Sequence, residues 1–156
     1  MDPVSQLIET WQIHDRIHQY LLAEIAAEHL SDVSASKGRS VGEQFAHLHN
    51  VRLMWLKSAA PELLAGLEKV EKDAALDKAG LAAALVASGK AIAGLLAEAL
   101  AAGGKIKGFK PHATAFLGYL ISHESHHRGQ ILLTLKQNKH AVSQKVGFGL
   151  WEWGVR

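Results

Sequence analysis

Two histidines, His123 and His127, have the spacing of metal ligands on one helix. They lie four residues apart, so on an α-helix their rings project from the same face, one turn from each other. Two imidazoles placed in this way can bind one metal ion at about 2.0–2.1 Å each. Both fall on an apolar stripe with Tyr119, Leu120 and Ile131. We therefore expect both rings to point inward, where a buried imidazole needs a partner for its nitrogens.

The stretch at 43–56 offers two candidates for a third ligand, His47 and His49. Because they are two residues apart, they face roughly opposite sides of a helix. Phe45 and Leu48 mark the inward side of this helix, and His47 lies close to that flank. Spacing alone does not decide which of the two histidines completes the site.

The chain holds ten histidines, an excess that metal binding, proton chemistry or a histidine-rich surface would explain. His14 and His18 are also four residues apart. They could form a second pair, contribute to the same site or lie in solvent, and we favour solvent. His126 is one step off the stripe, so we expect it at the edge of the stripe or in solvent. Exposure is also expected for the histidines near predicted helix ends, which are His29, His112 and His140.

The segment from His123 to His127 also matches the zincin pattern H-E-x-x-H, in which the glutamate activates a zinc-bound water. The extended metzincin pattern needs glycine at position 130 and histidine at 133, where this chain has Gln130 and Leu133. The sequence also shows no strand along which a peptide substrate could lie. A metalloprotease is therefore not the favoured interpretation.

Four segments with apolar residues at three- and four-residue steps must position these side chains. We expect helices at residues 3–29, from the N-cap Ser40 to just before Pro61, at 78–102 and at 112–138. Glu43 completes a capping box with Ser40. A short helical connection is expected between 61 and 78, and the tail to residue 156 should pack back over the bundle. The predicted fold is all-α, a four-helix bundle in a single domain at 1–156.

Composition narrows the function classes. Hydrophobic residues make up 48% and charged residues 21% of the 156 residues, the balance of a soluble globular domain. A net charge of +2 without a run of basic residues gives no reason to expect nucleic acid as a partner. The chain has no cysteine, which excludes disulfides and thiolate ligands. The N-terminus does not resemble a signal peptide and the longest apolar stretch is interrupted, so we expect no membrane insertion and a cytoplasmic protein.

Residues 38–48 and 119–131 resemble the second-helix and fourth-helix segments of the DinB / YfiT-like family of metal-binding four-helix bundles. The resemblance covers nearly the whole chain, including the ending at 150–153. It implies that His47, His123 and His127 form a ligand triad for a divalent ion such as zinc or nickel. It also implies a homodimer. Residues 128–130, Arg-Gly-Gln, are expected to pack behind the triad, with Gly129 allowing close helix contact.

Three protein nitrogens leave a coordination position open, as in catalytic metal sites. An ion so bound can activate a water molecule or a thiol. The resemblance implies a metal-dependent enzyme acting on a small molecule, either a thiol S-transferase for low-molecular-weight thiols such as mycothiol or bacillithiol, or a hydrolase. Glu124 is a candidate proton acceptor unless it faces solvent. The alternatives are a metal-binding or stress-response protein without turnover, and a metal-free bundle whose histidines are structural.

Overall fold

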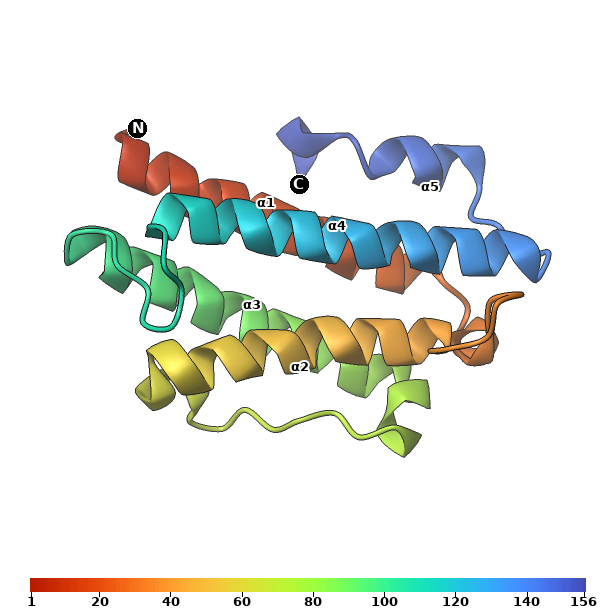
Figure 1. Ribbon diagram of the computed structural model, residues 1–156. Helices are drawn as coiled ribbons and strands as arrows, with labels where there is room; N and C mark the ends of the chain where they lie inside the picture. The colour runs from red at the N-terminus through yellow and green to blue at the C-terminus, as the bar shows by residue number, and fades with distance from the viewer.

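The computed structural model describes residues 1–156, and its regular structure is entirely helical. Four long helices lie side by side (Figure 1): α1 (Pro3–Glu24), α2 (Val41–Ala59), α3 (Lys78–Ala101) and α4 (Ala113–Gln137). The expectation of an all-α chain is confirmed. The remaining elements are short, and they are η1 (Ala27–Ser31), η2 (Pro61–Leu64), η3 (Asp73–Leu76), α5 (Gln144–Gly149) and η4 (Trp153–Val155).

Side-chain caps fix where α2, α3 and α4 begin. At α2 the Ser40 hydroxyl accepts from the Glu43 amide at 3.2 Å, and the Ser40 amide donates to the Glu43 carboxylate at 2.7 Å. At α3 the Asp77 carboxylate accepts from an amide of the first turn. At α4 the ring of His112 accepts from the Ala115 amide at 3.2 Å. Each cap satisfies a backbone N–H that has no partner within its helix, so these boundaries agree closely with the predicted ones.

The first helix is shorter than predicted. It ends at Glu24 rather than at residue 29, because Ile25 is extended and η1 follows as a separate turn. The ammonium group of Lys78, at the start of α3, donates to the carbonyls of Ala23 and Ile25 at 2.9 and 2.6 Å. A cation from a neighbouring helix therefore satisfies the last carbonyls of α1, an arrangement that local periodicity does not predict.

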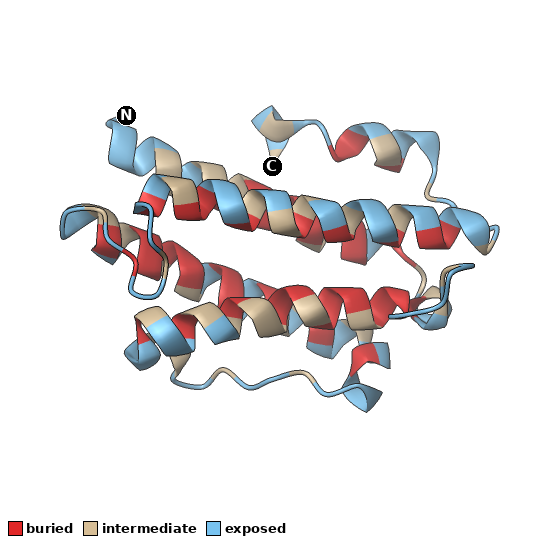
Figure 2. Cartoon of the chain, viewed as in Figure 1, coloured by how far each residue is buried: buried red, intermediate tan, exposed pale blue.

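The helices bury their facing sides (Figure 2). Helices α1 and α2 each contact both α3 and α4. The core consists of two apolar clusters, one near each end of the long helices. One centres on Ile17, Leu21, Phe45, Leu85 and Ile131, and the other on Trp11, Leu56, Ile92, Phe116 and Leu120. Between them lies a layer of buried polar side chains, which are His14, Asp15, His18, Arg52, Ser88 and Glu124.

Helix α3 is long and apolar enough to cross a membrane by length and composition alone, and 44% of its most apolar window is buried inside the protein. It lies against α1 and α2 along its length. Packing against two neighbours accounts for an apolar helix of this kind.

The C-terminal tail returns over the bundle beside α1 and α4 (Figure 1). Val146 and Leu150 are buried, and Trp153 packs against the first apolar cluster. The guanidinium of Arg156 lies 3.7 Å from the ring centroid of Tyr20 on α1. Trp151, in contrast, is 75% exposed, so it contributes little to the packing of the tail.

Candidate metal centre

Three imidazoles converge between α2 and α4. His47 comes from α2, and His123 and His127 come from successive turns of α4. One ring nitrogen from each lies within 4.8 Å of one nitrogen from each of the others. The ring centroids are 4.5 Å apart for His47 and His127 and 4.7 Å apart for His123 and His127. His127 is buried, whereas the other two are half-buried, so the cluster lies at the edge of the interior with access to solvent.

The three rings are neutral at physiological pH. Burial lowers the pKa of His47 to about 4, assisted by the nearby charge of Arg39. Burial also lowers the pKa of His127 to about 4, assisted by the neighbouring histidines. Burial also lowers the pKa of His123. A neutral imidazole is the form that coordinates a metal ion, so no proton has to be displaced before binding at pH 7.

A glutamine orients the most buried ring of the triad. The Nδ1 atom of His127 lies 2.7 Å from the amide oxygen of Gln44, and the amide nitrogen of Gln44 donates to Gln130 at 3.2 Å. Because the glutamine oxygen can only accept, His127 Nδ1 donates and its Nε2 keeps a free lone pair. Metal-binding histidines commonly have an acceptor of this kind on their second nitrogen.

The residues present fit a divalent ion. The donor set is three neutral imidazoles, which suits zinc, nickel, copper or iron. The Nδ1 atom of His123 is buried and has no hydrogen-bond partner, so the protein leaves this ring uncommitted. Unpartnered buried polar atoms are uncommon and ask for a function. A metal ion held by the triad would give the His123 ring a function.

His49, the second candidate on α2, lies outside this cluster. It is buried on the other side of the helix, with its two ring nitrogens 3.0 and 2.8 Å from the carbonyl oxygens of Ala84 and Glu68. Both nitrogens therefore face backbone acceptors and neither is free for a metal. The side chain ties α2 to α3 and to the connection before it.

A second cluster, formed by His14, His18 and Glu124, also has the spacing of a metal site. The expectation that His14 and His18 lie in solvent is wrong, because both are completely buried. His14 Nε2 lies 3.0 Å from the Glu124 carboxylate, and His18 Nδ1 lies 3.1 Å from the His14 carbonyl. Both nitrogens must carry protons to donate to these oxygens. The nitrogens that face these oxygens are engaged, whereas His14 Nδ1 and His18 Nε2 are buried without a hydrogen-bond partner. We favour the triad as the metal centre because Glu124, the carboxylate of this second cluster, is already paired with Arg52.

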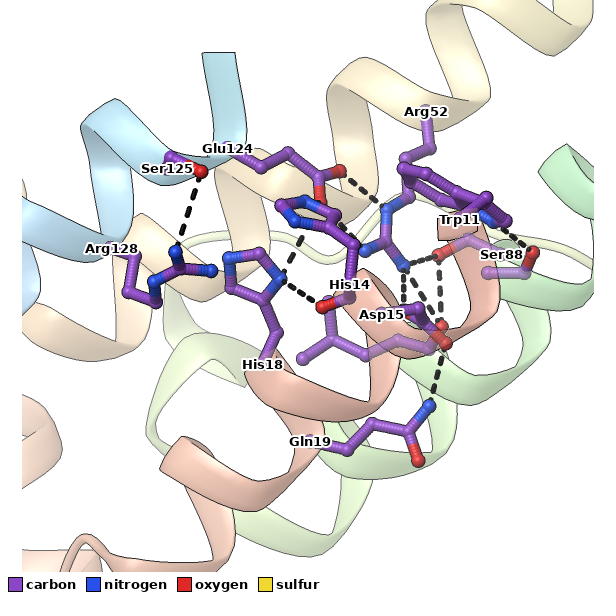
Figure 3. Close-up of polar contacts among 12 residues, drawn as sticks. Trp11, His14, Asp15, His18, Gln19, Arg52, Ser88, Glu124, Ser125 and Arg128 are labelled. Atoms are coloured by element: carbon purple, nitrogen blue, oxygen red, sulfur yellow. Dashed lines mark hydrogen bonds and ion pairs between the residues drawn. The ribbon is translucent and has the colours of Figure 1, made fainter. Parts of the chain in front are cut away.

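Arg52 of α2 organises this polar layer (Figure 3). Its guanidinium binds both oxygens of Glu124 at 2.7 and 2.9 Å and pairs with Asp15 at 2.8 Å. The nitrogen that faces Asp15, Nη1, also donates to the Ser88 hydroxyl and the Leu85 carbonyl at 3.2 and 3.0 Å. Every guanidinium nitrogen thus has an acceptor, the condition under which a buried charge is tolerated.

Glu124 faces the interior and is 1% exposed, so the alternative that it faces solvent is wrong. Burial opposes its ionisation, but Arg52 and a hydrogen bond from His14 outweigh burial and hold the pKa of Glu124 far below its ordinary value. A carboxylate of such low pKa, with both oxygens already engaged, is a poor proton acceptor. Its geometry indicates that it anchors α4 between the two turns that carry His123 and His127. This arrangement also argues against the zincin mechanism.

The segment after the last triad histidine differs in part from expectation. Gly129 faces solvent, and a Cβ added there would meet no atom within 4 Å. The expectation that this glycine allows close helix contact is therefore wrong. Gln130 is exposed, and its side chain accepts from the amide of Gln44, the residue that orients His127. Arg128 is half-buried beside His18, where its charge contributes to lowering the pKa of that ring.

The buried histidines predict a pH dependence of the metal-free protein. Burial lowers the pKa of His18 well below 6.5, and it lowers the pKa of His47 and His127 to about 4. Below 6.5 the unfolded chain gains protons that the folded protein does not, so the free energy of unfolding should fall as the pH drops. Above 6.5 these groups are neutral in both states and have no effect.

Urea denaturation in EDTA at about pH 7.5 and about pH 5 measures this loss, because that interval spans the ordinary histidine pKa. The variant His18→Gln should lose less stability over the same interval than the unmodified protein. An equal loss in both proteins would show that His18 does not carry the effect.

The fold and site together define an all-helical protein with a three-histidine cluster between two of its long helices. The sequence model of the DinB family matches residues 1–144, most of the chain. The chain therefore belongs to the DinB family. No curated protein and no solved structure gives a significant match. The matched region contains the whole triad and the polar layer and ends at the start of α5.

Proposed function

We propose that this DinB-family chain binds one divalent metal ion, zinc or nickel, through His47, His123 and His127. The observation that carries the proposal is the convergence of three neutral imidazoles, one of them oriented by Gln44. The proposal takes the four long helices as one four-helix bundle domain at 1–156. A homodimer and a cytoplasmic location remain predictions, as does the absence of nucleic acid and membrane partners.

We further propose a metal-dependent enzyme for a small molecule, of the thiol S-transferase or hydrolase type. A metal ion with an open coordination position supplies a Lewis acid that activates a thiol or a water molecule. A cavity of about 440 Å³ reaches the triad at His127, which suits a small-molecule substrate. The protein's own residues then have to hold the substrate and keep the imidazoles neutral and oriented.

A second candidate function is a metal-binding or stress-response protein without turnover. The specific observation in its favour is the position of Glu124. This carboxylate is the nearest one to the triad along α4, yet Arg52 and His14 hold it inside the polar layer. The triad therefore has no free carboxylate on α4 to accept a proton, and turnover would need a proton acceptor from another element, the substrate or solvent.

The test of the metal site is the metal content of protein purified without a histidine tag. The unmodified protein should hold about one equivalent of zinc or nickel by mass spectrometry, as expected for a single three-histidine site. His123→Ala and His127→Ala should lose it, while His126→Ala, an exposed neighbour, should retain it. Metal absent from the unmodified protein after reconstitution with zinc and nickel would contradict the proposal.

Activity then separates the two candidates. Metal-loaded protein should turn over a member of a panel of thiol and ester substrates, and treatment with EDTA should abolish the turnover. Retention of full turnover after chelation would exclude the metal mechanism. Stable metal uptake without turnover across the panel would favour the non-catalytic function.

A further inference from the structure

The cavity beside the triad is lined mainly by polar residues and carries positive charge. Twelve residues line it and only Leu133 among them is hydrophobic. Lys37 and Arg39 contribute two cationic groups, and no acidic residue is present in the lining. Hydroxyl and amide groups supply the rest of the wall, notably those of Ser34, Ser36, Gln44, Gln130, Thr134 and Gln137. Such a wall favours a polar, negatively charged ligand over an apolar one.

These two cations have no acidic partner. Neither Lys37 nor Arg39 takes part in a salt bridge, and both are exposed. On the other side of the triad, a cavity of about 330 Å³ includes His47 and again Arg39. There the lysines are compensated, because Lys72 pairs with Glu43 at 3.6 Å and Lys69 with Glu71 at 3.4 Å. Of the two cavities beside the triad, the one at His127 therefore carries the uncompensated positive charge, and Arg39 borders both.

The loop that carries the cations is held in place. Ser40 and Val33 form an isolated bridge that closes its base. From α4, the Gln137 side chain accepts from the Ala35 amide at 2.8 Å. Just beyond α4, the amide of Asn138 donates to the Val33 carbonyl at 2.9 Å. These contacts dock the loop on the end of the helix that bears His127.

The backbone of this loop is also strained at Lys37, one of the two cationic residues. Lys37 has a positive φ of 67°, and the hydroxyl of Ser34 donates to its carbonyl at 2.8 Å. A non-glycine residue in this region costs free energy and persists only where its surroundings hold it there. Gly38 follows with a φ of 102°, a conformation that glycine adopts without strain. The turn places Lys37 and Arg39 together over the cavity.

Arg39 lies beside the triad. It lines the first cavity together with His127 and the second together with His47. An anion bound at Arg39 would therefore lie beside the triad.

We propose that Lys37 and Arg39 form an anion subsite that holds the carboxylate or phosphate group of a small polar substrate beside the histidine triad. That the bound molecule is a substrate rests on the proposed function, whereas anion binding itself does not require a metal. An arginine fork binds either anion through two parallel hydrogen bonds, and a lysine adds a point charge. The hydroxyls and amides of the cavity wall would bind the uncharged polar part.

The test is a titration of metal-free, full-length protein followed by backbone amide NMR. The probes are inorganic phosphate, succinate and glycerol, at constant ionic strength. Phosphate or succinate should give saturable shifts at the amides of residues 34–39, and glycerol should give none. The stronger of the two anions identifies the group that the subsite prefers.

Matched variants separate a built subsite from general charge attraction. Arg39→Gln should weaken binding about tenfold, the loss expected for a charged hydrogen-bonding partner, and Lys37→Gln should weaken it less. Lys72→Gln removes the same charge from the other cavity and should leave the affinity unchanged. Absence of saturable shifts at 34–39, or equal affinity in Arg39→Gln and Lys72→Gln, would overturn the inference.

Metal content distinguishes failure of this inference from failure of the proposed function. Arg39→Gln should bind as much zinc as the unmodified protein, because Arg39 is not a ligand. Anion binding without metal uptake would leave the subsite standing and remove the metal centre. Metal uptake without anion binding would do the reverse.

Discussion

Replacement of Arg52 by leucine should lower the free energy of unfolding by about 3–5 kcal/mol, the usual cost of removing one partner from a buried ion pair. Arg52 is completely buried, and it is the partner of both Glu124 and Asp15. Its loss would leave two carboxylates without their counter-charge in the interior. It would also remove a cation that lies 4.9 Å from the ring centroid of Trp11.

Urea denaturation at pH 7 measures the effect, with Lys57→Leu as the control. Lys57 also lies on α2 but is exposed, so the same loss of charge there should change stability by less than about 0.5 kcal/mol. The double variant Arg52→Leu with Glu124→Leu removes both charges of the closest pair and should recover part of the loss. Equal stability of Arg52→Leu and Lys57→Leu would show that the ion-pair network does not stabilise the fold.

Gly89→Ala should lower the free energy of unfolding by about 3 kcal/mol, at the upper end of the usual cost of overpacking. A Cβ at this position would overlap the carboxylate of Asp15. The Gly89 carbonyl also accepts from the indole of Trp11 at 2.8 Å, so α1 and α3 cannot easily move apart. The added methyl group must therefore displace Asp15 from Arg52.

Gly129→Ala is the matched control for this change. Gly129 is also inside a helix, but a Cβ there would meet open space. The substitution should raise stability by about 0.5–1 kcal/mol, because alanine loses less backbone entropy than glycine on folding. Thermal or urea unfolding of the two variants should thus give effects of opposite sign. A neutral Gly89→Ala would show that α1 and α3 can separate without cost.

The sequence predicted the triad only in part from spacing. A four-residue step places His123 and His127 on one face of α4, and the structure brings them together. The choice between His47 and His49 came from the resemblance, because His47 is half-buried and His49 is the more buried of the two. His49 is fully buried against carbonyls from α3 and from the preceding connection. Periodicity distinguishes a buried face from an exposed one, and it does not report which histidine keeps a ring nitrogen free of backbone acceptors. The role of His47, His123 and His127 as metal ligands stays a prediction.

The polar layer was the larger omission. His14 and His18 stand at three- and four-residue steps between Trp11 and Leu21, and Arg52 stands four residues after Leu48 and four before Leu56. Polar side chains at such positions are ordinarily taken as edge residues. Their burial depends on partners far away in the sequence, such as Glu124 for His14. No local pattern reports that such partners exist. The available signal was three polar residues in inward positions on two helices of one bundle.

The end of the first helix could not be predicted for a similar reason. The apolar pattern continues past Glu24, but the chain turns because Lys78 of another helix satisfies the terminal carbonyls. The caps of α2, α3 and α4 were more predictable, because each involves a side chain within three residues of the helix start. Local signals fixed local boundaries, and the remaining boundary required a contact between helices.

The polar layer between the two apolar clusters has a consequence for how the helices align. Leucines and alanines on either side would tolerate a slip of one helix by a single turn, since apolar contacts have no direction. Such a slip would separate Glu124 from Arg52 and bury each charge alone, which is far more costly. We therefore expect the layer to select one register among several that the apolar clusters permit. Replacing the layer by hydrophobic residues would raise the free energy of unfolding but leave the helix register less well defined.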